Sequence, residues 1–466
     1  MWRSAGAGVA GVSIISAGLC AFNSLRHSNS DTSVTSASSS WSLRGDCGNR
    51  FGSWATVKAA PSASTQAATS TEGLRLHNVQ LFARHGARTP LAISPPFTEY
   101  VWNKEELDDL PKTMIPVLLV STEGGPRPKS RHEEFFKTEQ FKGGAYIGQL
   151  TKLGQSQGYT LGQKLRKRYV EEVPFLSPTY EPGEIYARSS NLNRTAYSLR
   201  CVLAGLLDYP RREITDMVEI EISPSKEENL YPNTNFCPAL NAMQTVGTAP
   251  MLADMCIPGH RKDRETVAKL IGIPADLLSF IKYRDLISCA ESHGMEIPPD
   301  LKCWSEKITR YASQMLTFVC GGMPDQGDLV LQMGVGPLLT MVAKNVFKSL
   351  SHQRTYKMQL YSCHDTTIHG LLIALGIPED GWPPYCADLA IETYARQDKA
   401  AFVQVKYLGE VQKLPTCKDS LCTISEFKET VSRYYVTAEK WDKLCGSNPE
   451  SRSQAAQQPY VRPTGV

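Results

Sequence analysis

The sequence lacks the features that mark a metal enzyme or a nucleic-acid-binding protein. Its 9 histidines include no HExxH pair and its 13 cysteines no CxxC pair, the spacings of common zinc sites. Cys417 and Cys422, with four residues between them, are too far apart for a zinc ribbon. With 50 Lys and Arg against 47 Asp and Glu, the chain also lacks the positive excess typical of nucleic-acid binding. We therefore predict no metal, no cofactor and no nucleic-acid partner.

The amino terminus lacks acidic residues, since none occurs before Asp31, and it has an apolar run, 5–22, between Arg3 and Arg26. This pattern predicts a targeting segment, 1–31, which is either a secretory signal or short anchor, or a mitochondrial presequence. Glycine and serine make the run a mediocre membrane span. Residues 32–72 have few large apolar side chains and predict a disordered linker, and 446–466 predict a disordered tail.

The cysteines are odd in number, so at least one thiol has no intramolecular partner. The late cysteines lie in or near predicted loops and can form disulfides in an oxidising compartment, in pairs that the sequence leaves open: Cys386, Cys417, Cys422 and Cys445.

Strand-like and helix-like stretches alternate along the rest of the chain. Strands are predicted at 74–82, 184–188, 217–222, 357–361, 389–394 and 402–407, and helices at 150–172, after 189–191, at 336–350 and at 367–375. The Pro- and Gly-rich stretch 93–144 is expected to be irregular. The alternation predicts an α/β fold with a mostly parallel central sheet and helices on both faces. We assign this core to 73–223 and 327–445, and a largely helical inserted cap to 224–326.

Charged residues follow three of the predicted strands. Arg84-His85-Gly86-Ala87-Arg88-Thr89-Pro90 follows the first strand, Arg188 ends another, and His364-Asp365 follows a third. Open α/β sheets bind ligands beyond the carboxyl ends of their strands, so these residues are expected to meet at one edge.

This combination of side chains suits phosphate-ester chemistry. Arginine binds two phosphate oxygens at once, and a neutral imidazole can form a covalent phosphoryl intermediate. We predict His85 as nucleophile, Asp365 as proton donor, and Arg84, Arg88, Arg188 and His364 as phosphate ligands. Each segment alone has an ordinary alternative: Asp365 could cap the next helix, and Arg188 could form a surface ion pair.

The Arg-His-Gly-x-Arg-x-Pro and His-Asp motifs resemble those of the histidine acid phosphatases, in the histidine phosphatase superfamily. The resemblance implies the same site roles and metal-independent phosphomonoester hydrolysis. Further stretches, Gly143 to Lys152, Tyr169 to Thr179 and Trp382-Pro383-Pro384, resemble the members that hydrolyse lysophosphatidic acid to monoacylglycerol and phosphate. That likeness implies a lysophospholipid substrate and favours a mitochondrial location, with the secretory pathway or a lumenal membrane anchor as the alternative.

Two other functions stay open at this stage. One is a phosphatase of the same fold for a soluble ester, such as a sugar or inositol phosphate, and the other is a non-catalytic phospho-ligand binder. We further expect a monomer with peripheral membrane contact. The sequon Asn193-Arg194-Thr195 lies near the predicted site, where a glycan would obstruct it, so we expect it to be unmodified.

Overall fold

The computed structural model describes residues 73–323, 325–351, 355–379 and 381–446. The predicted targeting segment, the linker up to residue 72 and the tail from residue 447 lie outside the described residues. The strands are β1 (Arg75–Arg84), β2 (Val117–Ser121), β3 (Ile185–Ser189), β4 (Val218–Ile222), β5 (Met358–Cys363), β6 (Asp388–Ala395), β7 (Ala401–Tyr407), β8 (Glu410–Gln412) and β9 (Leu421–Thr423).

The helices divide into those of the core and those of the cap. Core helices are α2 (Arg131–Phe136), α3 (Lys152–Arg166), α4 (Asn193–Leu206), α11 (Gly327–Gly334), α12 (Gly336–Leu350), α13 (Asp365–Leu375), α14 (Ile424–Ser432) and α15 (Ala438–Cys445). Cap helices are α5 (Pro238–Thr248), α6 (Pro250–Cys256), α7 (His260–Leu270), α8 (Phe280–Ser292), α9 (Pro299–Lys302) and α10 (Ser305–Cys320).

The strands form one mixed sheet in the order β2-β4-β3-β5-β1-β6-β7-β8, with β9 beside β7. The first five strands in this order run parallel, and β6 to β9 pair antiparallel. The α/β class is confirmed. The predicted irregular stretch, however, contains the edge strand β2 and the helix α2.

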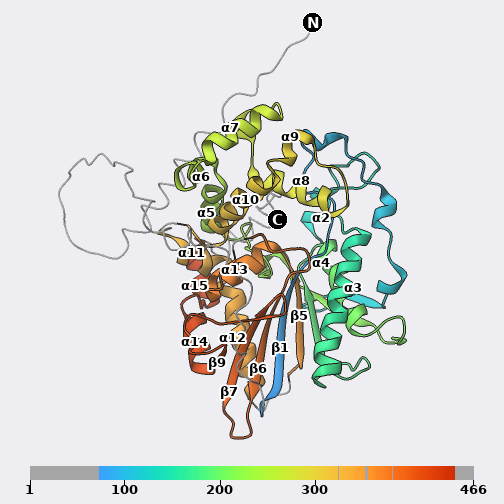
Figure 1. Cartoon of the computed structure of the whole chain (residues 1–466). Coiled ribbons are helices and arrows are strands. Elements are labelled where there is room, and N and C mark those ends of the chain that lie inside the picture. The colour runs from blue at the N-terminus through green and yellow to red at the C-terminus, as the bar shows by residue number, and fades with distance from the viewer. Residues whose placement is uncertain (1–72, 324, 352–354, 380, 447–466) are drawn as a thin grey trace, which may run out of the picture. The chain divides into compact units, whose positions relative to one another are not determined.

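Both faces of the sheet are buried, as the apolar strand sequences predict. Along β1, Leu81 and Ala83 belong to one core cluster, which contains side chains of α3 and α4, whereas Phe82 belongs to another, formed with α12, α13 and α14. Since neighbouring side chains of a strand point to opposite faces, these helices cover the sheet from both sides (Figure 1).

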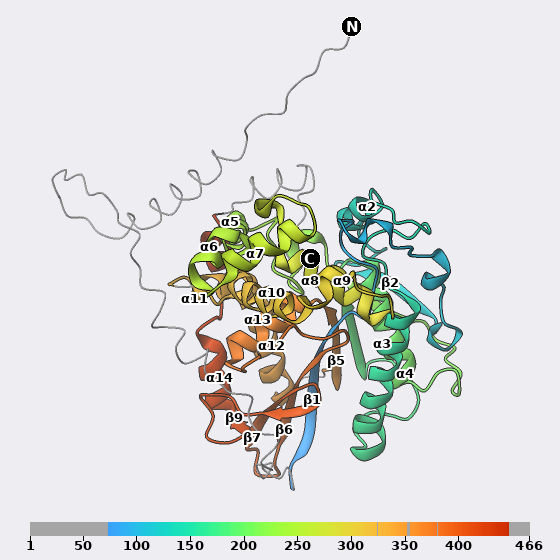
Figure 2. The same ribbon diagram turned by 45° about the horizontal axis from the view of Figure 1, so that its top comes forward.

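The carboxyl ends of β1, β3 and β5 meet at one edge of the sheet. The amide of His85 donates to the carbonyl of Cys363 at 3.1 Å, and the amide of Ser190 donates to that of Ser362 at 3.2 Å. The cap helices lie beyond this edge (Figures 1 and 2), where α10 packs against α5, α8 and α13. The topology therefore gathers residues distant in sequence under the cap.

Two disulfides join described cysteines. Cys237 pairs with Cys445 and connects the start of the cap to α15, and Cys417 pairs with Cys422. Cys386, the remaining member of the late set, is free.

Within the described residues, no single helix is long and apolar enough to cross a membrane. Helices α11 and α12, which meet at a bend, are together long and apolar enough, by length and composition alone.

Helices α3 and α4 cross at a distance that requires glycine. A Cβ on Gly205 would overlap the carbonyl oxygen of Tyr159 and lie 2.9 Å from the amide nitrogen of Gln163. The backbone of α3 contacts Gly86, and α4 contains Arg194, so the spacing of the two helices positions both residues.

We expect Gly205→Ala to lower the free energy of unfolding by about 1–3 kcal/mol, since the added methyl group must push the helices apart. Gly334→Ala is the matched control, because its Cβ would meet only Pro232 at 3.8 Å or more. Urea unfolding of both variants checks this, and equal stabilities would contradict the packing described.

Candidate active site

His85 lies at the centre of the carboxyl edge and is 2% exposed. Its Nδ1 lies 2.8 Å from the carbonyl oxygen of Gly86. Because a carbonyl oxygen only accepts, Nδ1 carries the proton and Nε2 presents a lone pair. Gly86 makes this turn fit, since a Cβ there would lie 2.7 Å from the carbonyl carbon of Gly154 in α3. The imidazole is thus held as a nucleophile.

Arg84 and Arg88 flank His85, and both are almost fully buried. Nη2 of Arg84 lies 2.9 Å from Oδ2 of Asp365, and its guanidinium stacks over Tyr385 at 4.4 Å. Nη2 of Arg88 lies 2.9 Å from Oδ1 of Asp285, a residue of the cap helix α8. Each cation is therefore held by a carboxylate that comes from another part of the chain.

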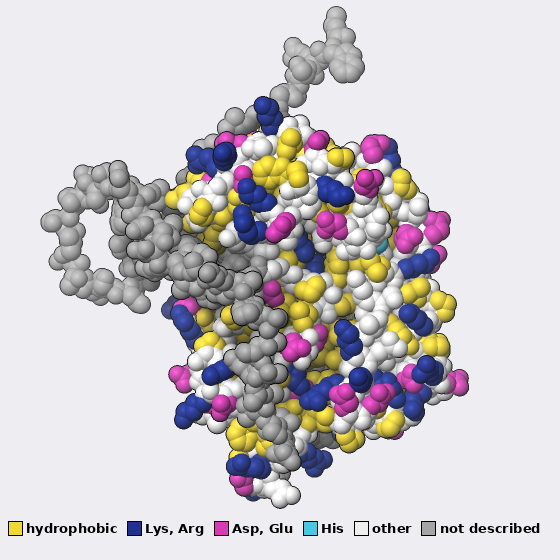
Figure 3. Space-filling view, in the orientation of Figure 1, with side chains coloured by type: hydrophobic (Ala, Val, Ile, Leu, Met, Phe, Trp, Pro, Cys, Tyr) yellow, Lys and Arg dark blue, Asp and Glu magenta, His cyan; other side chains and the backbone are white. Residues whose placement is uncertain are grey.

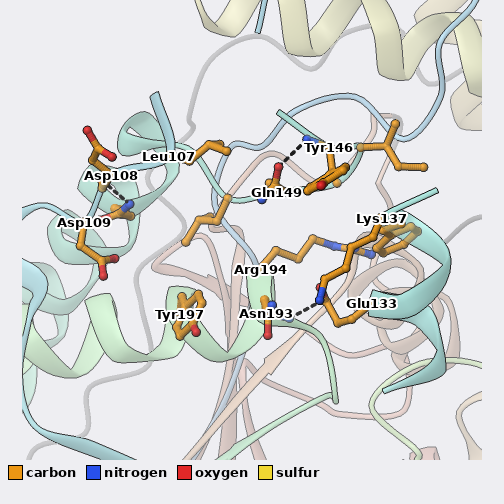
Figure 4. A pocket seen from close by; sticks show the side chains of 15 residues that line it. Leu107, Asp108, Asp109, Glu133, Lys137, Tyr146, Gln149, Asn193, Arg194 and Tyr197 are labelled. Carbon is orange, nitrogen blue, oxygen red and sulfur yellow. Dashed lines mark hydrogen bonds between the residues drawn. The ribbon is translucent and has the colours of Figure 1, made fainter. Parts of the chain in front are cut away.

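Arg194, in the first turn of α4, supplies a further guanidinium. It is 1% exposed, and its positive charge acts on both His85 and His364. Its guanidinium lies over the Phe136 ring at 5.1 Å, and it lines a cavity of about 430 Å³ between α2, α4 and the loop that contains Gln149 (Figure 4). In the sequence, Arg194 stands out only as part of the sequon Asn193-Arg194-Thr195.

The structure does not bring Arg188 into this group, which corrects its predicted role. Arg188 lies within β3 beside Tyr361, and its Nη2 donates to Asn229 at 2.9 Å and lies 3.2 Å from Oε1 of Glu228. Burial of Glu228 raises its pKa, although Arg188 and backbone amides oppose that shift. Arg188 thus fixes the segment after β4, and Arg194, five residues beyond the strand end, occupies the place predicted for it.

His364 and Asp365 lie at the start of α13, next to His85. The His364 ring meets the His85 ring edge-on at 5.7 Å between centroids, and its Nε2 lies 2.9 Å from Oγ of Ser190. Asp365 accepts from the indole nitrogen of Trp382 at 2.8 Å through Oδ2. Its Oδ1 accepts from the amide of Thr366 in the first turn of α13, whose N-cap is His364 and not Asp365.

The site keeps both imidazoles neutral. Burial, followed by the positive charges of Arg194, Arg84 and Arg88, holds the pKa of His85 well below 6.5. Burial and Arg194 act in the same direction on the pKa of His364. A neutral His85 at ordinary pH is what nucleophilic attack on phosphorus requires.

Asp365 is ionised in the unliganded site. Burial alone would raise its pKa, but Arg84 and the hydrogen bond from Trp382 outweigh that effect and lower it below 3.8. A proton donor must therefore obtain its proton when an anion occupies Arg84, because the anion then neutralises the charge that keeps Asp365 ionised.

Sequence reasoning missed the side chains that hold this group from the cap and the late loop. Asp285 accepts from Arg88 and from the amide of Leu91, both at 2.9 Å, and its pKa is lowered, because Arg88 outweighs the effect of burial. Trp382 fixes Asp365. In the sequence, Trp382-Pro383-Pro384 stands out only as a likeness to relatives, and nothing in the local pattern around Asp285 predicts a contact with Arg88.

In the described part of the chain, no group of three His, Cys, Asp or Glu side chains is arranged to hold a metal ion.

Comparison with known proteins identifies the family. The model of the histidine phosphatase superfamily (branch 2) matches residues 75–270 and 305–408. The chain belongs to this family. Membership confirms the prediction of a histidine phosphatase, a hydrolase of phosphoric monoesters.

Curated relatives span most of the chain. It is 36% identical to lysophosphatidic acid phosphatase type 6 of Mus musculus over 80% of this chain and 88% of that protein. It is 34% identical to the Homo sapiens protein of that name, over 80% and 86%. Prostatic acid phosphatase of Homo sapiens is 26% identical, over 66% of this chain and 83% of that protein.

Solved structures share the fold at low identity. Hafnia alvei phytase in complex with tartrate superimposes with a TM-score of 0.53 at 14% identity, over 82% of this chain and all of that one. The phytase from D. castellii gives 0.54 at 16%, over 81% and 83%.

Substitutions of Arg194 and Arg188 are expected to have opposite effects on phosphate binding and stability. We expect Arg194→Gln to lower kcat/KM for a phosphomonoester at least about a hundredfold and to weaken inhibition by inorganic phosphate, since a desolvated charge–phosphate contact is lost. Arg188→Gln, the matched control, should lower the melting temperature by several degrees, because it leaves Glu228 buried without its partner. It should leave the phosphate inhibition constant within about threefold. A larger loss of phosphate binding in Arg188→Gln would reverse the assignment.

Proposed function

We propose that the chain is a metal-independent acid phosphatase that hydrolyses lysophosphatidic acid to monoacylglycerol and phosphate through a phosphohistidine. The observation that carries the chemistry is the buried, neutral His85 among Arg84, Arg88 and Arg194, with Asp365 at the start of the adjacent helix α13. A pure phosphate binder would need the cations but neither a nucleophile with a free Nε2 nor a carboxyl group held beside it.

The reaction proceeds in two displacements. The arginines and His364 bind the phosphoryl oxygens, and Nε2 of His85 attacks phosphorus while the P–O bond to the leaving group breaks. Asp365 gives its proton to the departing oxygen, which leaves as an alcohol. Water then attacks the phosphohistidine, its proton passes to the Asp365 carboxylate, and inorganic phosphate departs.

The lysophospholipid substrate is supported by the names of the relatives. The cavity beside Arg194 bears on ligands with several phosphates. Its lining combines Leu107, Phe136, Ile147 and Leu150 with the acidic Asp108, Asp109 and Glu133, and its cations are Lys137 and Arg194 (Figure 4). Three carboxylates would repel a ligand with several phosphates, which counts against an inositol polyphosphate. A faster kcat/KM for a phosphosugar than for lysophosphatidic acid would favour the soluble-ester alternative.

Peripheral membrane contact suits a lipid substrate and remains part of the proposal, as does a monomer. Met251 and Met255 of α6 and Leu277 are exposed apolar side chains of the cap. Figure 3 shows apolar and basic side chains close together at the top of the molecule, where Figure 1 places the cap. Vesicle co-sedimentation tests the contact, which Met251→Ser with Met255→Ser should weaken. Light scattering at micromolar concentration tests the monomer, and a dimer mass would contradict it.

For location, we propose mitochondria, with the secretory pathway or a lumenal anchor as the alternative. Disulfides persist in oxidising compartments. The two disulfides therefore favour the secretory pathway or a lumenal anchor over a reducing compartment. Fractionation of cells after thiol blocking tests both points, and a fully reduced protein would remove the argument from the disulfides.

The covalent intermediate is directly testable. In Asp365→Asn, with excess chelator present, phosphate from a labelled substrate should accumulate on His85, because the leaving group lacks its proton donor and the attacking water its base. We expect kcat to fall about a hundredfold or more. Mass spectrometry of acid-sensitive phosphopeptides locates the label, and His85→Ala is the control that should carry none. Label on another residue would contradict the nucleophile assignment.

The pH dependence follows from the directions of the pKa shifts. Asp365 is a carboxylate in the free enzyme above pH 4, so the required proton arrives on the monoanionic ester, whose second pKa is about 6. We expect kcat/KM to fall about tenfold per pH unit above pH 6 and to stay level from pH 6 to 5, since His85 remains neutral there. A loss of kcat/KM centred near pH 6.5 on acidification would show that His85 titrates normally.

A further inference from the structure

Arg284, in the cap helix α8, is a buried cation that the reaction described above leaves unused. It is 7% exposed, and its Nε is buried without a hydrogen-bond acceptor. Within the described parts of the chain no carboxylate lies within salt-bridge distance of its guanidinium, although Asp365 and Asp285 attract it from farther away. Its neighbour Asp285 is occupied by Arg88 and the amide of Leu91. A buried cation without a close counter-charge destabilises the fold, so we expect a ligand to bind Arg284.

The position of Arg284 connects it to the proton donor. Its guanidinium lies over the Trp382 ring at 4.4 Å from the centroid. The indole nitrogen of Trp382 donates to Oδ2 of Asp365 at 2.8 Å. Trp382 is thus a platform with the Asp365 carboxyl group at its polar edge and the planar guanidinium on its face.

The direction of the reaction then determines what reaches Arg284. In an in-line displacement, the nucleophile and the leaving oxygen lie on opposite sides of phosphorus. Asp365 protonates the leaving oxygen, so the leaving group extends on the side of Asp365 and Trp382. Arg284 therefore borders the alcohol part of the ester, while Arg84, Arg88, Arg194 and His364 surround His85 and the phosphoryl group.

The electrostatic surroundings of Arg284 favour the binding of ligand oxygen atoms that accept hydrogen bonds. Burial, followed by the positive charge of Arg84, lowers the pKa of Arg284 to about 10 and outweighs the opposing effects of Tyr385, Asp365 and Asp285, so that Arg284 is still a cation at neutral pH but a destabilised one. A guanidinium offers several N–H donors in one plane, which suits two neighbouring oxygens better than an alkyl chain.

We propose that Arg284 is a specificity-determining residue that binds oxygen atoms of the leaving group, such as the hydroxyl or ester carbonyl of a glycerol backbone. The identity of that backbone rests on the proposed function; the position of Arg284 does not. Esters whose leaving group is a polyol are then preferred over esters of plain alcohols of the same length, and the preference is set by the cap and not by the phosphate ligands.

The test compares two small esters that differ only in these oxygens, glycerol 3-phosphate and propyl phosphate. In Arg284→Met, which keeps the bulk but removes the donors, kcat/KM for glycerol 3-phosphate should fall about ten- to a hundredfold, since hydrogen bonds to a charged group are lost. That for propyl phosphate should change less than threefold. Any shift in the titration of Asp365 affects both esters equally and cancels in their ratio. Arg284→Lys, which keeps the charge but not the planar donors, should lie between the two.

An equal loss for both esters, or no loss for either, would overturn the proposal. The inhibition constant of inorganic phosphate reports whether each variant keeps a folded phosphate site, and a change of more than threefold would also count against it, because Arg284 would then act on the phosphoryl group. Hydrolysis of lysophosphatidic acid by the unaltered enzyme is measured separately. Its absence would refute the lipid substrate without affecting the comparison of the two small esters.

Discussion

The interaction on which this structure depends is the repulsion among buried guanidinium groups around one uncharged imidazole. Arg84, Arg88 and Arg194 are each at most 2% exposed, and together they would destabilise the fold if nothing opposed them. Two carboxylates do so in the unliganded state: Asp365 holds Arg84 and Asp285 holds Arg88. A dianionic phosphoryl group is the ligand that relieves the remaining repulsion. Burial, together with the same cations, keeps His85 deprotonated and therefore nucleophilic.

This charge balance explains why the cap belongs to the site. Asp285 on α8 holds a phosphate ligand of the core, and the Cys237–Cys445 bond fixes the start of the cap to α15. Core and cap therefore share the catalytic charges, and a change in the cap helices can alter specificity while the Arg-His-Gly and His-Asp motifs remain intact.

The sequence was sufficient for the parts of the site that follow local rules. Alternating apolar residues predicted β1 and β5, and their parallel pairing brings His85 and Asp365 to one edge. Arg188 is the last residue of the predicted strand and was expected to reach the edge, whereas β3 continues to Ser189 and the residue that reaches the edge is Arg194 in the next helix. The helix start after a strand is a common anion site, so Arg194 was recognisable in principle. Asp285 and Trp382 were not, because their contacts join segments separated by 197 and 17 residues without a repeating pattern. The strand β2 was missed because its five residues lie inside a stretch rich in proline and glycine.

The most direct test of the central claim is a crystal structure of the Asp365→Asn variant with inorganic phosphate. Phosphate oxygens should accept hydrogen bonds from Arg84, Arg88, Arg194 and His364, with phosphorus within about 3.5 Å of Nε2 of His85. Arg188 should stay on Glu228. Phosphate bound elsewhere, or contacted by Arg188 in place of Arg194, would contradict the account.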